Sequence, residues 1–175
     1  MSRNTPDLDS NPAGLRTAEV STPLGVFRLG YVGKSVIYND LMERGIERFG
    51  LPPEGPIEHG PFAPGSPPRQ LTEYFQGRRK DFDLDFHLLR GTEFNLKVWA
   101  ELSRIPYGSS RTYGEVAKRI HRPLAARAVG GAAHRNPIPI MIPCHRLVGK
   151  GGDLTGFGLG MWRKKWLLEH EGLKL

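Results

Sequence analysis

The stretch NPIPIMIPCHR, residues 136–146, constrains the fold more than any other part of the 175-residue chain. Pro137, Pro139 and Pro143 have no backbone N–H group, so they cannot donate the hydrogen bonds of a regular element. We therefore predict an extended, stiff segment that presents the following residue, Cys144, in a fixed direction.

Cys144 is the only cysteine of the chain, so an intramolecular disulfide is impossible. A single cysteine is usually a small, buried, apolar side chain. His145 and Arg146, however, supply a potential base and a positive field, and both favour the reactive thiolate. Because neighbouring side chains of an extended segment point to opposite sides, a contact between Cys144 and His145 requires a bridging water or a turn. The residues alone leave a packed thiol and a nucleophile as alternatives.

The net charge of +7 is concentrated in the C-terminal half. Residues 1–91 carry 11 Lys and Arg against 12 Asp and Glu, whereas residues 92–175 carry 14 against 6. A basic half beside a neutral half indicates a surface for a polyanion such as DNA, because Lys and Arg near phosphates release condensed counterions. A chance excess on a solvated surface is the alternative.

Short strands and helices are predicted for the N-terminal half, which is an α/β pattern. A change in composition and charge near Gly91 indicates the boundary between two domains, over 17–91 and 92–175. In chain order we expect a loose tail over 1–16, a meander of strands over 17–39, a helix over 41–50, an irregular loop rich in Pro and Gly over 51–68, a helix over 66–80 with prolines near its first turn, and a half-buried strand over 81–89.

Helices dominate the prediction for the C-terminal half. Thr92 can cap the first helix, whose apolar stripe ends before the IPYGSS stretch. Thr112 and Glu115 have the spacing of a capping box that opens a second helix. Pro123 suits the first turn of a third helix, over residues 123–136. Two short helices joined by a tight turn in a basic half are a candidate helix-turn-helix, although many helical pairs share this pattern.

The third of these helices carries small side chains where a helix that reads DNA sequence presents Arg, Asn, Gln or Ser. Apart from Arg127, residues 125–133 are Ala, Val and Gly. This pattern indicates contact with DNA without sequence preference, with Arg127 as the one long probe. Tight packing against a neighbouring helix would explain the same small residues.

Near the C-terminus, MWRKKWLLEHEG predicts an amphipathic helix that ends at Gly172. Glu171 lies in its last turn, where the helix dipole disfavours an anion. This position is mild evidence for a second task, such as orienting His145, and a solvated terminal carboxylate is the simpler interpretation.

Several other classes of protein fit the sequence poorly. The His and Cys residues lack the spacing of a metal site, and the longest apolar runs are too short to cross a bilayer. The first residues lack the apolar core of a signal peptide. We therefore expect no metal ion, no membrane association, and a location in a reducing compartment, the cytoplasm.

The motifs RAVGGA, NPIPIMIPCHR and LLEHEG together resemble those of the O6-alkylguanine-DNA alkyltransferases, also called methylated-DNA–protein-cysteine methyltransferases. The resemblance is continuous from GTEFNLKVWAELSRIPYG to Gly172 and weaker in LTEYFQGRRKDFDL. It implies an RNase H-like α/β N-terminal domain and a mostly helical C-terminal domain with a winged-helix-like helix-turn-helix. Phe157 departs from the tyrosine of many relatives, and a chain with one cysteine cannot reproduce the zinc site that some relatives have.

The resemblance implies a role for four residues around the cysteine. Cys144 corresponds to the alkyl acceptor, His145 to its water-mediated base, and Glu171 to the acid that orients this histidine. Asn136 corresponds to an asparagine that braces the helix-turn-helix against the active-site segment.

The resemblance also implies contacts with DNA and with the damaged base. Tyr113 corresponds to a tyrosine that crowds the phosphate of the target and donates a hydrogen bond to the flipped base. Arg127 corresponds to an arginine that fills the gap left in the base stack. The further positions that match binding residues are Ala126, Ala128, Gly130, Pro139, Arg146, Val148, Phe157 and Gly158.

The implied reaction is direct reversal of DNA damage. O6-alkylguanine, and also O4-alkylthymine, is flipped out of double-stranded DNA, and its alkyl group moves irreversibly to Cys144, once per protein molecule and without a cofactor. The resemblance implies a monomer and leaves cooperativity on DNA open. The rivals are an alkyltransferase-like lesion-binding protein, in which the cysteine is replaced, a DNA-binding regulator, which needs neither PCHR nor Glu171, and a thiol hydrolase, which needs an oxyanion site.

Overall fold

The computed structural model describes residues 13–44, 56–88 and 91–174. The chain divides into two compact units, unit 1 up to Leu89 and unit 2 from Arg90 onward. The tail predicted over 1–16 lies outside the described residues as far as residue 12. Most of the helix predicted over 41–50 lies outside them as well, and its described part consists of Leu41, which ends a strand, and a 3₁₀ turn, Met42–Arg44.

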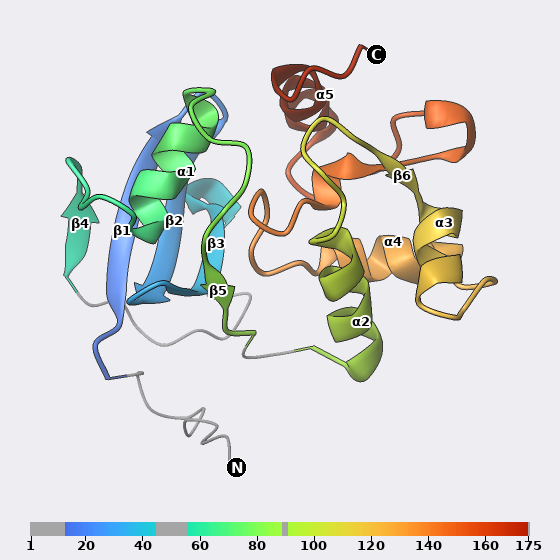
Figure 1. The fold of residues 1–175 in the computed structure, drawn as a ribbon, viewed down its shortest axis with the longest axis horizontal. Helices are drawn as coiled ribbons and strands as arrows, with labels where there is room; N and C mark the ends of the chain where they lie inside the picture. Colours follow the sequence, from blue (N-terminus) through green and yellow to red (C-terminus); the bar gives the residue numbers. More distant parts are fainter. Residues whose placement is uncertain (1–12, 45–55, 89–90, 175) are drawn as a thin grey trace. The chain divides into compact units, whose positions relative to one another are not determined.

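Unit 1 is built on a five-stranded sheet with the order β4-β1-β2-β3-β5 (Figure 1). Three consecutive antiparallel strands form its centre, β1 (Arg16–Thr22), β2 (Gly25–Val32) and β3 (Ser35–Leu41). The short strands β4 (Ile57–His59) and β5 (Asp85–Phe86) pair in parallel at the two edges. The predicted meander is confirmed.

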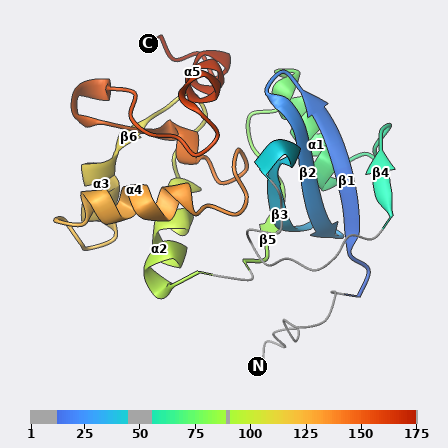
Figure 2. The same cartoon turned by 180° about the vertical axis from the view of Figure 1, so that it is seen from behind.

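The helix α1 (Pro67–Phe75) covers one face of this sheet, as the two opposite views in Figures 1 and 2 show. Pro67 and Pro68 occupy its first turn, where the missing N–H groups have no helical partner to lose. Its apolar face is buried against the sheet, and the ring of Phe75 lies 5.8 Å from that of Phe27 on β2. Burial of these side chains holds the helix on the sheet.

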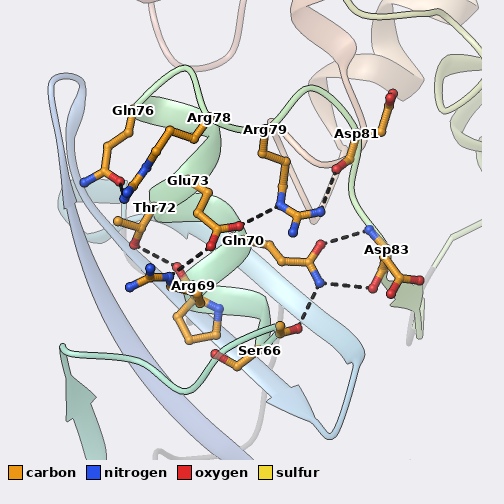
Figure 3. Close-up of polar contacts among 12 residues, drawn as sticks. Ser66, Arg69, Gln70, Thr72, Glu73, Gln76, Arg78, Arg79, Asp81 and Asp83 are labelled. Atoms are coloured by element: carbon orange, nitrogen blue, oxygen red, sulfur yellow. Dashed lines mark hydrogen bonds and ion pairs between the residues drawn. The ribbon is translucent and has the colours of Figure 1, made fainter.

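The side chain of Gln70 fixes the segment that follows α1 (Figure 3). Its Nε2 donates to the carbonyl groups of Gly65 (2.9 Å) and Asp83 (3.1 Å), and its Oε1 accepts the N–H of Asp83 (2.9 Å). Both peptide groups of Asp83 are therefore bonded to a side chain of the helix instead of to a neighbouring strand.

Two predictions for unit 1 are wrong in extent. Of the strand predicted over 81–89, the described residues contain only Asp85–Phe86; at its N-terminal side Gln70 takes the backbone hydrogen bonds of Asp83. The loop predicted over 51–68 contains β4 and the first residues of α1, and its residues 51–55 lie outside the described part of the chain. The free edge of β1 supplies the partner for β4, and local composition cannot show such a partner.

Unit 2 is mostly helical, with one small sheet whose two strands pair in parallel. Its helices and strands are α2 (Glu93–Leu102), β6 (Arg111–Thr112), α3 (Tyr113–Arg119), α4 (Ala126–His134), β7 (Leu147–Val148) and α5 (Met161–His170) (Figure 1).

Both predicted helix caps are confirmed. The Thr92 side chain accepts the N–H of Asn95 (3.2 Å) at the start of α2. At the start of α3, Thr112 Oγ1 accepts the N–H of Glu115 (3.2 Å), and the Glu115 carboxylate accepts the N–H of Thr112 (2.7 Å). These donors and acceptors lie within one turn of each other, so the local sequence suffices to form them.

The third predicted helix begins three residues later than expected, at Ala126. The N–H of Arg122 closes α3 by donating to the Ala117 carbonyl (2.9 Å), and the N–H of Ala125 donates back to the Arg122 carbonyl (2.9 Å). Pro123 thus occupies the second position of a turn, which its fixed φ also suits, instead of the first turn of a helix.

The small residues of α4 have two different environments. Val129 and Ala132 are buried, and the indole Nε1 of Trp99 on α2 donates to the Ala132 carbonyl (2.9 Å). Arg127 and Ala128 are exposed. One face of α4 therefore packs closely inside unit 2, as the packing interpretation predicted, while the opposite face is open to solvent.

Among the described residues, no helix has the length and apolarity needed to span a bilayer. In the same part of the chain, no three His, Cys, Asp or Glu side chains gather as ligands of a metal ion would.

Candidate functional site

The segment before the cysteine is folded back on itself, so the prediction of an extended segment is wrong. The N–H of Ile142 donates to the Ile138 carbonyl (2.9 Å), and Ile140 adopts a left-handed φ of 74°. Asn136 holds this turn by accepting the N–H of Ile138 (3.0 Å) and donating to the carbonyl of Ile142 (2.7 Å). One buried side-chain amide therefore supplies the hydrogen bonds that this turn needs, since the flanking prolines have no N–H group to donate.

The same amide reaches the thiol. Asn136 Nδ2 lies 3.1 Å from Cys144 Sγ and donates to it. Cys144 begins a 3₁₀ turn, Cys144–Arg146, and its side chain is almost fully buried. Hydrogen bonds to a thiolate favour the charged form, so Asn136 favours the reactive state of this sulfur.

Three side chains form a buried polar cluster behind Cys144. His145 Nε2 and Glu171 Oε1 are 2.8 Å apart, and neither side chain is exposed. Arg146 binds both oxygens of the same carboxylate, through Nε (2.9 Å) and NH2 (2.9 Å), and NH1 donates to the Ile105 carbonyl. Glu171 also accepts the N–H of Gly108 (3.2 Å). The carboxylate therefore has a full set of partners, as a buried charge requires.

Electrostatics favour a neutral imidazole beside a carboxylate. Burial lowers the pKa of His145 and outweighs the opposite influence of Glu171. Burial alone would raise the pKa of Glu171, but the hydrogen bonds and charges of His145 and Arg146 hold it well below its usual range. The carboxylate accepts from Nε2, which leaves Nδ1 as the basic nitrogen of the ring. Nδ1 is buried and has no hydrogen-bond partner among the described residues.

A pocket of about 970 Å³ opens above Cys144. Its walls come from the start of α3, one face of α4 and the loop over residues 155–158. The Tyr113 hydroxyl donates to the Gly156 carbonyl at 3.4 Å, a long bond that leaves the hydroxyl available to a ligand. Gly130 on α4 faces this tyrosine, and a Cβ there would lie 3.5 Å from the ring, in ordinary van der Waals contact.

Seven of the fourteen residues that the sequence implied line the pocket. Those that line the pocket are Tyr113, Ala126, Arg127, Gly130, Cys144, Phe157 and Gly158. His145, Glu171 and Asn136 support Cys144 from inside the protein, whereas Pro139 and Val148 are buried outside the pocket lining and Ala128 is exposed on α4.

Arg146 is buried, although the sequence implied a residue on the surface that contacts DNA or substrate. Its side chain is 7% exposed, and its guanidinium is used by Glu171 and by the Ile105 carbonyl. We therefore assign Arg146 to the support of Glu171, in place of the contact with DNA or substrate that the sequence implied.

Sequence reasoning missed Lys164. This residue lies on α5, is fully buried, and donates from Nζ to the carbonyl of Thr155 in the pocket wall (2.7 Å). Its helical spacing from Leu167, Leu168 and Glu171 places it on the buried face of α5, and that spacing was the available signal.

The sequence of the chain is similar to those of methylated-DNA–protein-cysteine methyltransferases. The family described as 6-O-methylguanine DNA methyltransferase, DNA binding domain, matches residues 93–173. The methylated-DNA–protein-cysteine methyltransferase of Mycolicibacterium paratuberculosis is 41% identical over 152 residues, which cover 87% of this chain and 89% of that protein. A protein of the same name from Methanosarcina acetivorans is 53% identical over 104 residues, 59% of this chain and 66% of the relative.

Comparison of structures gives the same neighbours. The crystal structure of Mycobacterium tuberculosis O6-methylguanine methyltransferase superposes with a TM-score of 0.74 and 39% identity, covering 90% of this chain and 92% of that one. The Mycobacterium tuberculosis OGT in complex with DNA gives a TM-score of 0.77 and 40% identity, over 89% and 92% of the two chains.

Proposed function

Because the chain belongs to the family of methylated-DNA–protein-cysteine methyltransferases, we propose that it repairs O6-alkylguanine in double-stranded DNA by transferring the alkyl group to Cys144. One observation carries the proposal. The only thiol of the chain lines a pocket, accepts a hydrogen bond from Asn136, and is followed directly by a histidine paired with a buried carboxylate.

The first step is the formation of the thiolate. His145 is neutral, and its Nδ1 carries the lone pair because Nε2–H donates to Glu171. We propose that Nδ1 takes the thiol proton through one water molecule. Glu171 stabilises the imidazolium that results, and Arg146 keeps the carboxylate charged and in place.

The second step is an in-line displacement at the alkyl carbon. A bond forms between Sγ of Cys144 and that carbon, the bond from the carbon to guanine O6 breaks, and its electron pair stays on the base. The base then takes up one proton, which gives guanine and an S-alkylcysteine. Tyr113, at the mouth of the pocket, is placed to donate a hydrogen bond to the leaving base.

The target atom is inaccessible inside a duplex, so the base has to be flipped into the pocket at a cost of about a few kcal/mol. We propose that α3 and α4 act as a winged-helix-like helix-turn-helix, with the open face of α4 on the minor groove. Arg127 is exposed, and no described residue pairs with it, so it can fill the gap that the flipped base leaves. Small side chains on α4 suit a protein whose lesion occurs in any sequence.

The product explains why each molecule reacts once. Water does not readily cleave a thioether at neutral pH, and nothing in the proposed steps returns the sulfur to its free form. The same chemistry extends to O4-alkylthymine, which carries an alkyl group on an equivalent oxygen. We further propose that unit 1 has an RNase H-like fold, that the domains span 17–91 and 92–175, and that the protein acts as a cytoplasmic monomer.

Mass spectrometry tests the proposed function directly. The protein and its Cys144→Ala variant are mixed with a duplex that contains one O6-methylguanine, and the intact mass and the peptide masses are measured. We expect one added methyl group per chain, located on Cys144, absent from the variant, and matched by one restored guanine. Binding of the duplex without any mass change would support a lesion-binding protein instead.

A further inference from the structure

Lys164 is a buried cation that the steps proposed above do not use. Its side chain extends from α5 with no exposed surface, and its Nζ donates to the Thr155 carbonyl (2.7 Å) and lies 6.0 Å from the centre of the Tyr113 ring. Among the described residues, no carboxylate lies within ion-pair distance of it.

Burial at this position destabilises the charged form of an ammonium group. Removal from water penalises the charged form unless an anion or several acceptors compensate. Burial accordingly lowers the pKa of Lys164 to about 8, and the charge of Cys144 acts in the opposite direction. A lysine buried in the pocket wall with one carbonyl acceptor therefore still lacks a counterion, and the Cys144 thiolate is the anion whose charge acts on it.

The other basic side chains close to the thiol are either paired with a carboxylate or neutral. Arg146 directs its guanidinium to both oxygens of Glu171, so its charge is neutralised locally, and His145 is neutral. The remaining charged or titratable residues of the pocket, apart from the half-buried Tyr113, are exposed and screened by solvent, namely Glu115, Lys118, Arg127, His134 and Lys150. Lys164 is thus the one buried, uncompensated positive charge that the described residues place near Cys144.

We propose that Lys164 stabilises the Cys144 thiolate as its buried counterion, while its hydrogen bond to Thr155 keeps the pocket wall in place. This inference rests on the proposed function, in which the thiolate is the nucleophile. Since α5 packs against the 3₁₀ turn Cys144–Arg146, the helix that supplies Glu171 to the histidine also supplies the cation to the sulfur. Lys164 acts on the reaction through the charge state of Cys144, so it is a positioning residue.

The reactivity of the thiol toward a small reagent tests this inference without DNA. Cys144 is the only cysteine, so the rate of modification by iodoacetamide reports on it alone. The rate is measured from pH 4 to 10 by intact mass, for the unchanged protein and for Lys164→Met, Lys164→Gln and Lys164→Arg. Lys165→Met serves as the matched control, because Lys165 is the adjacent residue on α5 and its side chain is 59% exposed.

The charge and the hydrogen bond give different patterns. If the charge matters, the pH midpoint of the rate rises by about one unit or more in both Lys164→Met and Lys164→Gln, because each removes a nearby opposite charge. Lys164→Arg restores most of the midpoint, and Lys165→Met keeps it. If Lys164 serves only to hold Thr155, the midpoint is the same in all variants and the inference is overturned.

Folding and function are separated by two further measurements. Methionine has nearly the length of lysine without its charge, so Lys164→Met should keep or raise the melting temperature, and Lys164→Gln decides the question if the methionine variant does not fold. Repair of the O6-methylguanine duplex should slow at least tenfold in Lys164→Met at pH 7 and approach the normal rate at higher pH. If the unchanged protein repairs nothing, the proposed function fails, and the iodoacetamide profiles still decide the role of Lys164.

Discussion

Replacement of Glu171 by glutamine should lower both stability and reactivity, because this carboxylate holds the polar cluster together. The change keeps the shape of the side chain but removes the negative charge that Arg146 and His145 share. It leaves a buried guanidinium without its counterion, and breaking a buried pair in this way costs about 3–5 kcal/mol. At ~2–4 °C per kcal/mol for a chain of this length, the melting temperature should fall by roughly 10 °C.

The same substitution should also change the tautomer of His145. A glutamine amide can donate to Nε2, which would move the ring proton to Nδ1 and remove the base that the thiol needs. Urea unfolding at pH 7 measures the stability, and the rate of methyl transfer from the O6-methylguanine duplex measures the reactivity. We expect the rate to fall at least tenfold at temperatures where the variant remains folded.

Glu169→Gln is the matched control, since Glu169 lies two residues earlier, in the last turn of α5, is 52% exposed, and pairs with Lys165 at 3.8 Å. An exposed pair of this kind contributes about 0–1 kcal/mol, so this variant should unfold close to the unchanged protein. A loss of stability in Glu171→Gln no larger than that of Glu169→Gln would refute the assignment of Glu171 as the centre of the cluster.

Three further predictions concern the same site. Because the pKa of His145 and that of Glu171 are both lowered in the folded protein, the free energy of unfolding should fall as the pH drops below about 6.5 and again below about 4.5, where the unfolded chain takes up protons first. Urea titrations at pH 7, 5.5 and 4 check this, and Glu171→Gln should weaken the second decline, to which the lowered pKa values of exposed carboxylates such as Glu73 and Asp83 also contribute. Asn136→Ala should lower the free energy of unfolding by about 2–4 kcal/mol, because the buried carbonyl of Ile142 and the N–H of Ile138 lose their hydrogen bonds. It should also slow thiol modification, and equal urea midpoints would contradict the expected loss of stability. Methylation of Cys144 should lower the melting temperature, because it removes the anion beside Lys164 and the acceptor of the hydrogen bond from Asn136; an unchanged melting temperature after complete reaction would count against this reasoning.

Local hydrogen bonding is the part of the fold that the sequence decided. Thr92 and the capping box of Thr112 and Glu115 join atoms three residues apart, and both were predicted and are confirmed. The strand meander also followed from local alternation. The start of the strand predicted over 81–89 did not follow from local sequence, because Gln70, 13 residues earlier, takes the backbone hydrogen bonds of Asp83.

The identity of the nucleophile also came from the sequence, since a chain with one cysteine next to a histidine and an arginine offers a short list of candidates. Its environment did not. The prolines predicted an extended segment, and the side chain of Asn136 overrode them by supplying the hydrogen bonds that a turn requires.

Only the tertiary structure decided what the charged residues do. The sequence left Glu171 as either a solvated terminal carboxylate or the partner of His145, and the structure places its Oε1 2.8 Å from Nε2 of this histidine, 26 residues earlier in the chain. The sequence does not show that Arg146 is buried, because the contacts that bury it come from distant segments. Likewise, nothing in the local sequence distinguishes the buried Lys164 from the exposed Lys165. The physical reason is that the energy of a charge depends on the solvent and the partners around it, and those are set by contacts between segments that are distant in the sequence.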